Sequence, residues 1–219
     1  MKRLYKRLLC IPIAFVLLSI ALVLVMKYVP VHYTPLMIKR SIQYSHDPDF
    51  ATKQNWVPLS NISQEVINTI VTSEDSRFWS HNGIDKNELK IMYREYKKGN
   101  TKLRGCSTIS QQVAKNCFTL CSNSYIRKFT ELYWTALIEM IWGKSRILEV
   151  YLNIAEMGYG IYGIEAASQK YYHCPASDIS IYEVAAIAIC MPCPLEKDPL
   201  TIWEQEPARI RKLIGSVNK

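Results

Sequence analysis

Two groups of ionisable side chains in this sequence have the types and spacing that acid–base chemistry requires. The first is Glu74 and Asp75, in the stretch EDSRFWSHNG (74–83), which follows an amphipathic segment and contains aromatic residues. Apolar neighbours raise the pKa of a carboxyl group toward neutrality, which would suit Glu74 to act as a general base. An acidic pair at the end of a helix is also a common surface feature, and both interpretations stay open at this point.

The second group is a strongly basic segment. Residues 86–128 contain ten lysines and arginines against Glu88 and Glu95, a net charge of +8, whereas residues 28–85 and 129–219 are net acidic. Cations gathered in this way attract an anionic partner such as a phosphate or a lipid headgroup. A solvated basic face has the same charge pattern, and charge alone does not separate the two.

A polar stripe runs along a helix predicted within this segment. Thr108, Gln112 and Lys115 have the i, i+4, i+7 spacing of one helix face. The predicted start of that helix at Ser107 offers unpaired backbone N–H groups to an anion.

The next predicted helix is apolar nearly all round and carries one polar line, with a spacing of four residues: Arg127, Glu131, Thr135 and Glu139. A mostly buried helix turns such a line toward water or toward a cleft. Taken alone, Arg127 and Glu131 also fit a simple surface ion pair.

Helices are predicted to position these side chains, because capping residues, helical periods and terminal glycines recur along the chain. The predicted helices are 85–98, 107–118, 124–142, 144–157, 180–192 and a last one from about Pro207. Alternating strand patterns are nearly absent, so the expected fold class is mainly α. The 219 residues, 49% hydrophobic and 21% charged, exclude a disordered chain and fit a single catalytic domain. No glycine fingerprint for nucleotides is present, and no nucleic-acid partner is expected.

The first residues predict a membrane anchor. Residues 8–26 carry no formal charge and, as a helix, reach about 28 Å, close to the thickness of the bilayer core. Four basic residues precede them, which predicts a cytoplasmic tail at 1–7 and export of the remaining chain. A cleavable signal peptide is the alternative, but no small-residue cleavage site follows residue 26. Residues 27–55 are then a poorly periodic juxtamembrane connector, and residues 56–219 form the domain.

Six of the seven cysteines follow the predicted anchor, where disulfides can form outside the cytoplasm. Cys190 and Cys193 have the spacing of half a redox or zinc site, but no second pair at ligand spacing accompanies them. Buried small hydrophobic side chains are therefore the favoured interpretation of these cysteines.

Four stretches, in order, resemble the motifs of the family 51 glycosyltransferases, the peptidoglycan glycosyltransferases of bacterial cell-wall synthesis, in their monofunctional, single-span form. They are EDSRFWSHNG (74–83), RGCSTISQQVAKN (104–116), RKFTE (127–131) and KSRILEVYLN (144–153). A fifth, basic motif is loosely present at 209–214. The resemblance covers residues 56–219 and departs from the family pattern at Cys106, in place of a glycine, and at Ser110, in place of a threonine.

The resemblance implies a lysozyme-like, two-lobed domain of mainly α fold, preceded by one transmembrane helix. It implies a protein of the bacterial inner membrane, with its catalytic domain on the periplasmic or extracellular side. The implied substrates are lipid II and the growing glycan strand: an acceptor 4-hydroxyl attacks C1 of the donor MurNAc with inversion, and undecaprenyl pyrophosphate leaves. No cofactor is obligatory, and Mg²⁺ or Mn²⁺ is an optional partner of the pyrophosphate. Other proteins of cell-wall synthesis and division are candidate partners.

By the same resemblance, Glu74 is the catalytic base and Glu131 is the second essential glutamate, which supports the pyrophosphate or its metal. Lys115, Arg127 and Lys128 are expected to hold the diphosphate. The other predicted substrate contacts are Asp75, Phe78, His81, Ser107, Thr108, Gln111, Gln112 and Asn116. By contrast, the apolar character of the predicted helix 144–157 predicts that Glu149, Tyr151 and Asn153 organise the core of the domain.

Two rival functions stay open. A lysozyme-like hydrolase or lytic transglycosylase would need an acidic glutamate but no diphosphate-binding cations, so the basic segment disfavours it. A membrane-tethered scaffold that only binds wall precursors would not depend on Glu74 at all.

Overall fold

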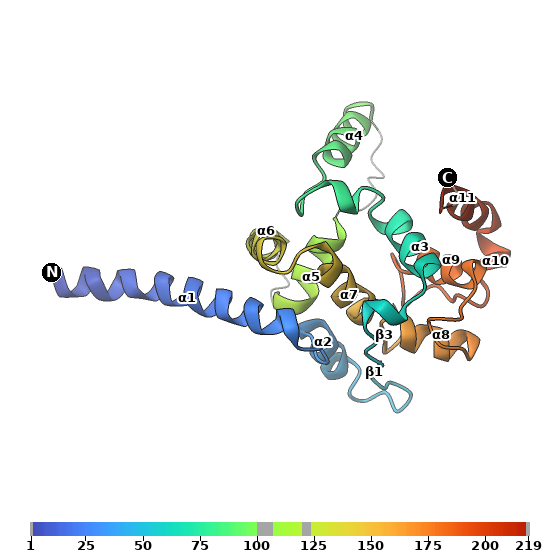
Figure 1. The fold of residues 1–219 in the computed structure, drawn as a ribbon, viewed down its shortest axis with the longest axis horizontal. Coiled ribbons are helices and arrows are strands. Elements are labelled where there is room, and N and C mark those ends of the chain that lie inside the picture. Colours follow the sequence, from blue (N-terminus) through green and yellow to red (C-terminus); the bar gives the residue numbers. More distant parts are fainter. Residues whose placement is uncertain (1, 100–106, 120–123, 218–219) are drawn as a thin grey trace.

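Helices dominate the protein, as the sequence predicts. The computed structural model describes residues 2–99, 107–119 and 124–217 (Figure 1). The helices of the domain are α3 (Gln64–Glu74), α4 (Lys86–Lys97), α5 (Ile109–Phe118), α6 (Ser124–Ile141), α7 (Lys144–Ile154), α8 (Ile164–Tyr172), α9 (Ile181–Cys190), α10 (Ile202–Gln205) and α11 (Pro207–Val217). Within the described residues a small sheet joins β1 (Lys53–Gln54), β2 (Glu156–Gly158) and β3 (Ile161–Tyr162) in the order β1-β3-β2.

The core brings together helices that are distant in the sequence. α5 contacts both α6 and α7, while α3 packs on α9 and α11 contacts both α3 and α9. The Val, Ala and Ile side chains of α9 are buried, as its apolar run predicts. Because α3 ends at Glu74, this packing leaves that carboxylate at the edge of the core, facing α5.

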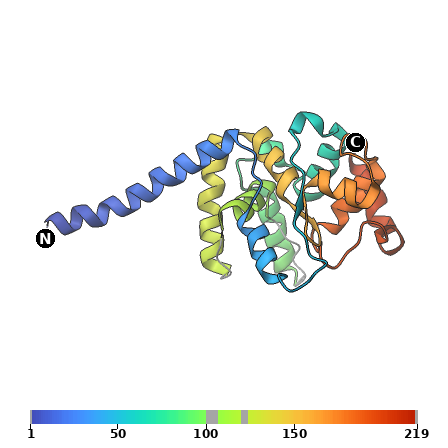
Figure 2. The ribbon, with the colours of Figure 1, turned by 90° about the horizontal axis from the view of Figure 1, so that it is seen from below.

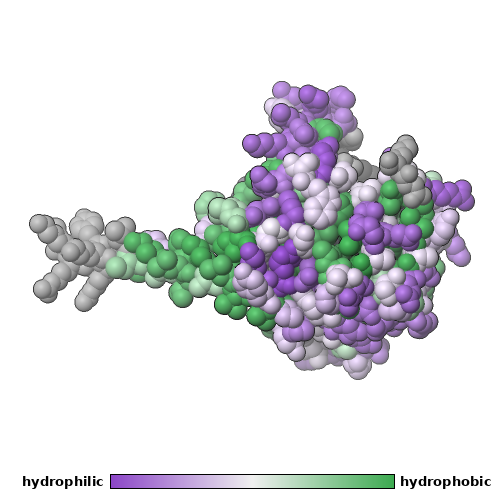
Figure 3. All heavy atoms as spheres, viewed as in Figure 1, coloured by the Kyte–Doolittle hydropathy of each residue, from purple (hydrophilic) through white to green (hydrophobic). Residues whose placement is uncertain are grey.

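An apolar helix stands out from this domain. α1 (Lys2–Tyr28) projects away from the other helices, with the start of the chain at its far end (Figures 1 and 2). Its segment Cys10–Tyr28 is long and apolar enough to cross a membrane, and its hydrophobic surface is largely uncovered (Figure 3). The side chain of Phe15 packs on Tyr133 of α6, and Trp142 Nε1 donates a hydrogen bond to the carbonyl of Val23 at 2.7 Å.

The range 27–55 contains regular structure that was not predicted. α2 (Pro35–Gln43) begins after Thr34, whose side chain accepts a hydrogen bond from the backbone of Met37, and it packs on α5. β1 follows and pairs with β3 in parallel. The Thr34-Pro35 pair is a strong helix start, because threonine caps the N-terminus and proline needs no hydrogen-bond partner there.

Two predicted helix boundaries are wrong by one to three residues. α5 takes Thr108 rather than Ser107 as its N-cap, in a reciprocal capping box with Gln111. α7 ends at Ile154 rather than at 157, because the chain there turns into β2 and β3. Ser180 and Glu183 form a reciprocal capping box at the start of α9.

The predicted helix at 85–98 is confirmed as α4. The apolar side chains that recur along it at the helical period do not join the core. The Asp85 side chain caps α4 by accepting from two backbone N–H groups, and Glu88 binds Arg77 instead of returning to the cap. α4 stands apart from the body of the domain (Figure 1), and its Tyr93 and Tyr96 are exposed.

The cap of α5 gives a testable contribution to stability. Thr108 Oγ1 accepts from Gln111 N and donates to the carbonyl of Gly83 at 2.7 Å, and both bonds are buried. Thr108→Ala should lower the free energy of unfolding by about 1–2 kcal/mol, measured by urea denaturation in detergent micelles. Thr201→Ala is the control, since Thr201 precedes α10 without a side-chain cap bond. Equal stability of the two variants would contradict this assignment.

Candidate active site

The side chains of the candidate site come from four helices, α3, α5, α6 and α7. Glu74 is the last residue of α3, Lys115 lies on α5, Glu131 lies on α6, and Tyr151 lies on α7. α5 packs on both α6 and α7, and its side chains are buried or half-buried.

Glu74 lies in an environment that favours its neutral form. Gln112 Nε2 donates to Glu74 Oε2 at 2.8 Å, and the Tyr151 hydroxyl lies 3.4 Å from that same oxygen. Burial raises the pKa of Glu74, although these hydrogen bonds and the nearby Lys115 oppose the shift. A carboxyl group of this kind is suited to accept a proton at neutral pH.

Lys115 connects the two predicted catalytic glutamates. Burial lowers the pKa of its ammonium, while the negative charges of Glu131, Glu156 and Glu74 act to raise it. Lys115 follows Gln112 by three residues, so both side chains leave the same face of α5. Glu74 and Glu131 are therefore both close enough to this ammonium for their charges to act on it.

Glu131 is buried beneath two cations of its own helix. It is only 1% exposed, and its two carboxylate oxygens lie 3.3 Å from Arg127 Nη1 and 2.5 Å from Lys128 Nζ. The two basic side chains are still partly exposed, and Lys128 Nζ also lies 3.4 Å from Ser107 Oγ. The site therefore presents three positive charges around one buried carboxylate, an arrangement that can bind a multiply charged anion.

The second half of the polar line on α6 points into the protein. Thr135 is buried and its hydroxyl donates to the Glu131 carbonyl at 2.7 Å. Glu139 accepts from Lys144 at 2.7 Å and from the Ser110 hydroxyl. Of the predicted polar line, Arg127 is partly exposed, whereas Glu131 is buried, Thr135 bonds within α6 and Glu139 binds α5 and α7.

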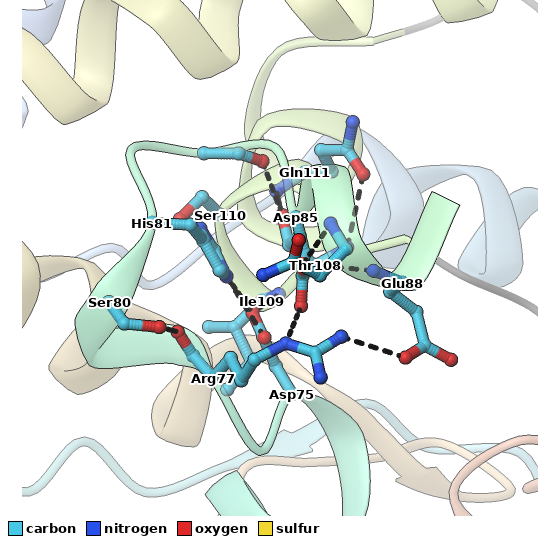
Figure 4. A network of polar contacts seen from close by, with 12 residues as sticks. Asp75, Arg77, Ser80, His81, Asp85, Glu88, Thr108, Ile109, Ser110 and Gln111 are labelled. Atoms are coloured by element: carbon cyan, nitrogen blue, oxygen red, sulfur yellow. Dashed lines mark hydrogen bonds and ion pairs between the residues drawn. The ribbon is translucent and has the colours of Figure 1, made fainter. Parts of the chain in front are cut away.

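Several predicted substrate contacts are directed inward and hold the site together. His81 Nε2 lies 3.0 Å from both oxygens of Asp75, which also accepts from Ile109 N at 3.0 Å (Figure 4). Phe78 is fully buried, with the Lys144 ammonium 4.4 Å from the centre of its ring. Asp75 and His81 thus join the 75–83 segment to α5, and the substrate contacts of Asp75, Phe78 and His81 stay predictions.

The residues of the second motif (104–116) that the structure describes also fall into two groups: some are held inside the protein, and others contact the candidate site. Thr108 and Gln111 are buried in the capping box and position α5. Gln112 contacts Glu74, and the charges of Glu74 and Glu131 act on Lys115. The contacts of these four residues with a substrate stay predictions. Asn116 is buried, and its Oδ1 has no hydrogen-bond partner in the part of the chain that the structure describes.

Tyr151 is a site residue that the sequence reasoning missed. It was predicted to organise the core, and it is buried there, but its hydroxyl also reaches Glu74 and Gln112. Glu149 and Asn153 do organise the domain: Glu149 accepts from Leu59 N, and Asn153 bonds both backbone groups of Val57. The motif KSRILEVYLN places Tyr151 on α7, but it does not show toward which neighbouring helix that side chain points.

The backbone conformation at Gly83 explains why the first motif ends in a glycine. Its φ of +85° is a conformation that residues with a side chain avoid, and an added Cβ would lie 2.6 Å from Thr135 Cγ2. Arg77 fixes the same segment through ion pairs of 2.7 Å to Asp85 and 3.0 Å to Glu88 (Figure 4).

The described residues do not form a metal site. No cluster of three or more His, Cys, Asp or Glu side chains is placed to hold an ion in these ranges of the chain. Glu131, the carboxylate predicted to support a metal, already has both oxygens next to cationic groups. A cation held mainly by the oxygens of a pyrophosphate needs only one or two protein carboxylates, so the optional Mg²⁺ or Mn²⁺ stays a prediction, and the chemistry derived below uses protein cations.

Five cysteines within the described ranges are free: Cys10, Cys117, Cys174, Cys190 and Cys193. Burial raises the pKa of the Cys190 thiol to about 12, so it is not a ready metal ligand or nucleophile. This agrees with the interpretation of Cys190 as a buried small hydrophobic side chain. Cys106 and Cys121 lie outside the described residues, as do Lys102 and Arg104 of the basic segment.

Comparison with known proteins bears directly on this site. A family model described as Transglycosylase matches residues 41–217. A biosynthetic peptidoglycan transglycosylase of Bdellovibrio bacteriovorus is 41% identical over 181 residues, which are 82% of this chain and 72% of the relative. Proteins of the same name from Rhodospirillum centenum and Bacteroides thetaiotaomicron are 39% identical over 217 residues and 43% identical over 178 residues. These alignments cover 99% and 81% of this chain, and 90% and 71% of the two relatives.

Proposed function

Because this chain belongs to the transglycosylase family and is a glycosyltransferase of peptidoglycan synthesis, we propose that it polymerises lipid II into glycan strands with inversion at the donor sugar. The mainly α, lysozyme-like fold expected from the resemblance is confirmed by this membership. The observation that carries the proposal is the half-buried ammonium of Lys115, on which the charges of both Glu74 and Glu131 act, together with the ion pairs of Glu131 with Arg127 and Lys128.

Glu74 is the proposed general base. The 4-hydroxyl oxygen of an acceptor GlcNAc forms a bond to C1 of the donor MurNAc, and its proton passes to Glu74. The bond from C1 to the phosphate oxygen breaks on the opposite face of the sugar, so the configuration at C1 inverts. Gln112 and Tyr151 hold the Glu74 carboxyl in place through one oxygen, Oε2.

Lys115, Arg127 and Lys128 are the proposed diphosphate-binding groups. Negative charge grows on the leaving undecaprenyl pyrophosphate as the C1–oxygen bond breaks, and fixed cations stabilise that charge in the transition state. Glu131 lies beneath Arg127 and Lys128 and holds their charged ends in one place. The partial exposure of both side chains supports a direct contact with the substrate.

The position of α6 supports a reaction at the bilayer surface, on the periplasmic or extracellular side. Phe15 and Ser19 of α1 both contact Tyr133, and α6 runs across the direction of α1 (Figure 2). If α6 lay wholly outside the bilayer, the part of α1 from Ser19 onward would lie outside as well, and only residues 8–18 would remain to cross it. As a helix these residues span about 16 Å, whereas the bilayer core is about 30 Å thick. We therefore place the exposed apolar side of α6, with Ile126, Phe129 and Met140, inside the outer leaflet.

A charge on that side of α6 should impair polymerisation in a bilayer. Phe129 is 76% exposed, and Phe129→Glu would put a carboxylate into the leaflet at a cost of about 2–3 kcal/mol. We expect the rate of glycan synthesis in lipid II-containing vesicles to fall about tenfold or more. Tyr182→Glu, at an exposed aromatic position on α9, is the matched control and should leave the rate unchanged. Equal rates for both variants would contradict immersion of α6.

The proposed function is tested by incubating the purified protein with labelled lipid II and, separately, with finished glycan. Polymer formed from lipid II supports polymerisation. Soluble fragments released from finished glycan alone would instead favour the lytic reaction, which needs no diphosphate-binding cations. Binding of lipid II without any product would favour the scaffold. The growing glycan strand is the proposed second substrate, and other cell-wall synthesis and division proteins remain predicted partners.

A further inference from the structure

The last turn of α1 has an unfilled hydrogen-bonding requirement of its own. The carbonyl of Met26 would normally accept from the backbone N–H of the residue four positions later, but that residue is Pro30, which has none. An apolar helix that ends beside a membrane core needs another donor for this carbonyl, because an unpaired buried carbonyl is costly.

Arg146, near the start of α7, supplies that donor. Its Nη2 donates to the carbonyl of Met26 at 2.7 Å and to the carbonyl of Val29 at 2.5 Å. Its positive charge lies at the C-terminal end of α1, where the helix dipole favours a cation. The side chain is only 13% exposed, so it acts in a poorly hydrated place.

The Arg146 side chain is itself fixed from several directions. Nη1 donates to Glu149, and the guanidinium lies 5.2 Å from the ring centre of Trp56 and 6.0 Å from that of Trp142. Trp142 also donates to the carbonyl of Val23, one turn earlier on α1. Two side chains of the domain therefore bind the carbonyls of Val23 and Met26 in the last turns of α1 and that of Val29 just past its end.

α7 connects these contacts with α1 to the proposed catalytic base. Arg146 and Tyr151 are five residues apart on α7, about 7.5 Å along its axis, and the Tyr151 hydroxyl contacts Glu74. A single short helix thus holds the exit of α1 at one end and the Glu74 carboxyl toward the other.

We propose that Arg146, together with Trp142, is a positioning residue that fixes the C-terminal end of α1 to the domain. The fixed end of α1 sets the distance from the bilayer to the site that contains Glu74, Lys115 and Glu131. This inference rests on the proposed function, because a fixed height matters only for a substrate that is itself anchored in the membrane. Arg146 touches no reacting atom: its effect passes through the orientation of the domain.

The test compares two forms of the substrate with the full-length protein. In vesicles that contain lipid II, Arg146→Ala should slow polymerisation about tenfold or more, because a misplaced site loses its alignment with an anchored substrate. In detergent, with a soluble lipid II analogue that carries a short isoprenyl chain, the same variant should keep its rate within about twofold of the wild type. The control is Arg209→Ala, which removes the ion pair between Arg209 of α11 and Glu206, three residues earlier. This variant should change neither rate.

Arg146→Lys guards against a general loss of folding. It keeps a cation beside Glu149 but lacks the planar fork that reaches both carbonyls, so it should show the same split between the two assays at a smaller size. Equal losses in vesicles and in detergent for Arg146→Lys, or no loss in either, would overturn the proposal.

Hydrogen exchange gives a readout that does not depend on activity. In vesicles, the backbone amides of residues 27–34 should exchange about tenfold faster in Arg146→Ala than in the wild type or in Arg209→Ala. Unchanged exchange would overturn the proposal. If the wild type made no polymer in either assay, the proposed function would fail, while this exchange difference would still decide whether Arg146 holds α1.

Discussion

Replacing Glu74 by glutamine should reduce polymerisation of lipid II about 10³-fold or more, while lipid II binding is retained. The amide keeps the size of the side chain and its contact with Tyr151, but it cannot accept the proton of the acceptor hydroxyl. Folding should not suffer, because burial raises the pKa of Glu74 and so disfavours its ionised form at neutral pH. The melting temperature of Glu74→Gln should therefore equal or exceed that of the wild type.

The pH dependence of the rate checks the same assignment. A general base works when it is ionised, so the rate should fall as the pH drops through the pKa of Glu74. Since burial raises that pKa, this loss should occur at a higher pH than an exposed glutamate would give. Glu65→Gln, in the first turn of the same helix and exposed, is the control and should leave both the rate and its pH profile unchanged. A Glu74→Gln variant that still polymerises lipid II would refute the assignment.

Removal of the Lys115 charge is expected to have the second largest effect. Lys115→Gln should lower the rate constant of polymerisation about 10²–10³-fold, because a fixed, poorly hydrated cation near the leaving group contributes mainly in the transition state. Competitive inhibition by inorganic pyrophosphate should weaken in parallel. The fold should tolerate the change, since Glu131 retains Arg127 and Lys128.

Two further variants make this prediction specific. Lys115→Arg keeps the positive charge and should retain more activity than Lys115→Gln, whereas Lys170→Gln, at an exposed position on α8, should have no effect. If Lys115→Gln and Lys115→Arg lost activity equally and pyrophosphate inhibition stayed the same, the diphosphate would have to be bound elsewhere.

The sequence predicts that Glu74, Lys115 and Glu131 belong to one site, but the contacts that each neighbouring side chain makes could not be predicted from it. A helical period assigns faces, so Gln112 and Lys115 could be placed together on α5 before their contacts were known. Residues 75–83 have no such period, since they form a loop with one short 3₁₀ turn. Nothing in their order shows that Asp75 and His81 bind each other.

Elsewhere the tertiary contacts decided what local patterns could not. The apolar stripe of α4 predicts burial, yet the helix stands apart from the core and leaves Tyr93 and Tyr96 exposed. The role of Tyr151 depends on how α7 packs against α5, and a motif alone does not give this packing. The Thr34-Pro35 helix start, by contrast, was present in the sequence and could have identified α2.

The hydrogen bonds around Glu74 have a consequence for antibacterial design. Gln112 and Tyr151 hold the base, and they come from two helices that pack on each other. Bacteria would therefore have difficulty in becoming resistant, through a mutation of Gln112, to a small molecule that binds beside Glu74 by a hydrogen bond to the Gln112 amide. A bacterium that replaced Gln112 to evade such an inhibitor would loosen its own base, and resistance would carry a cost in growth.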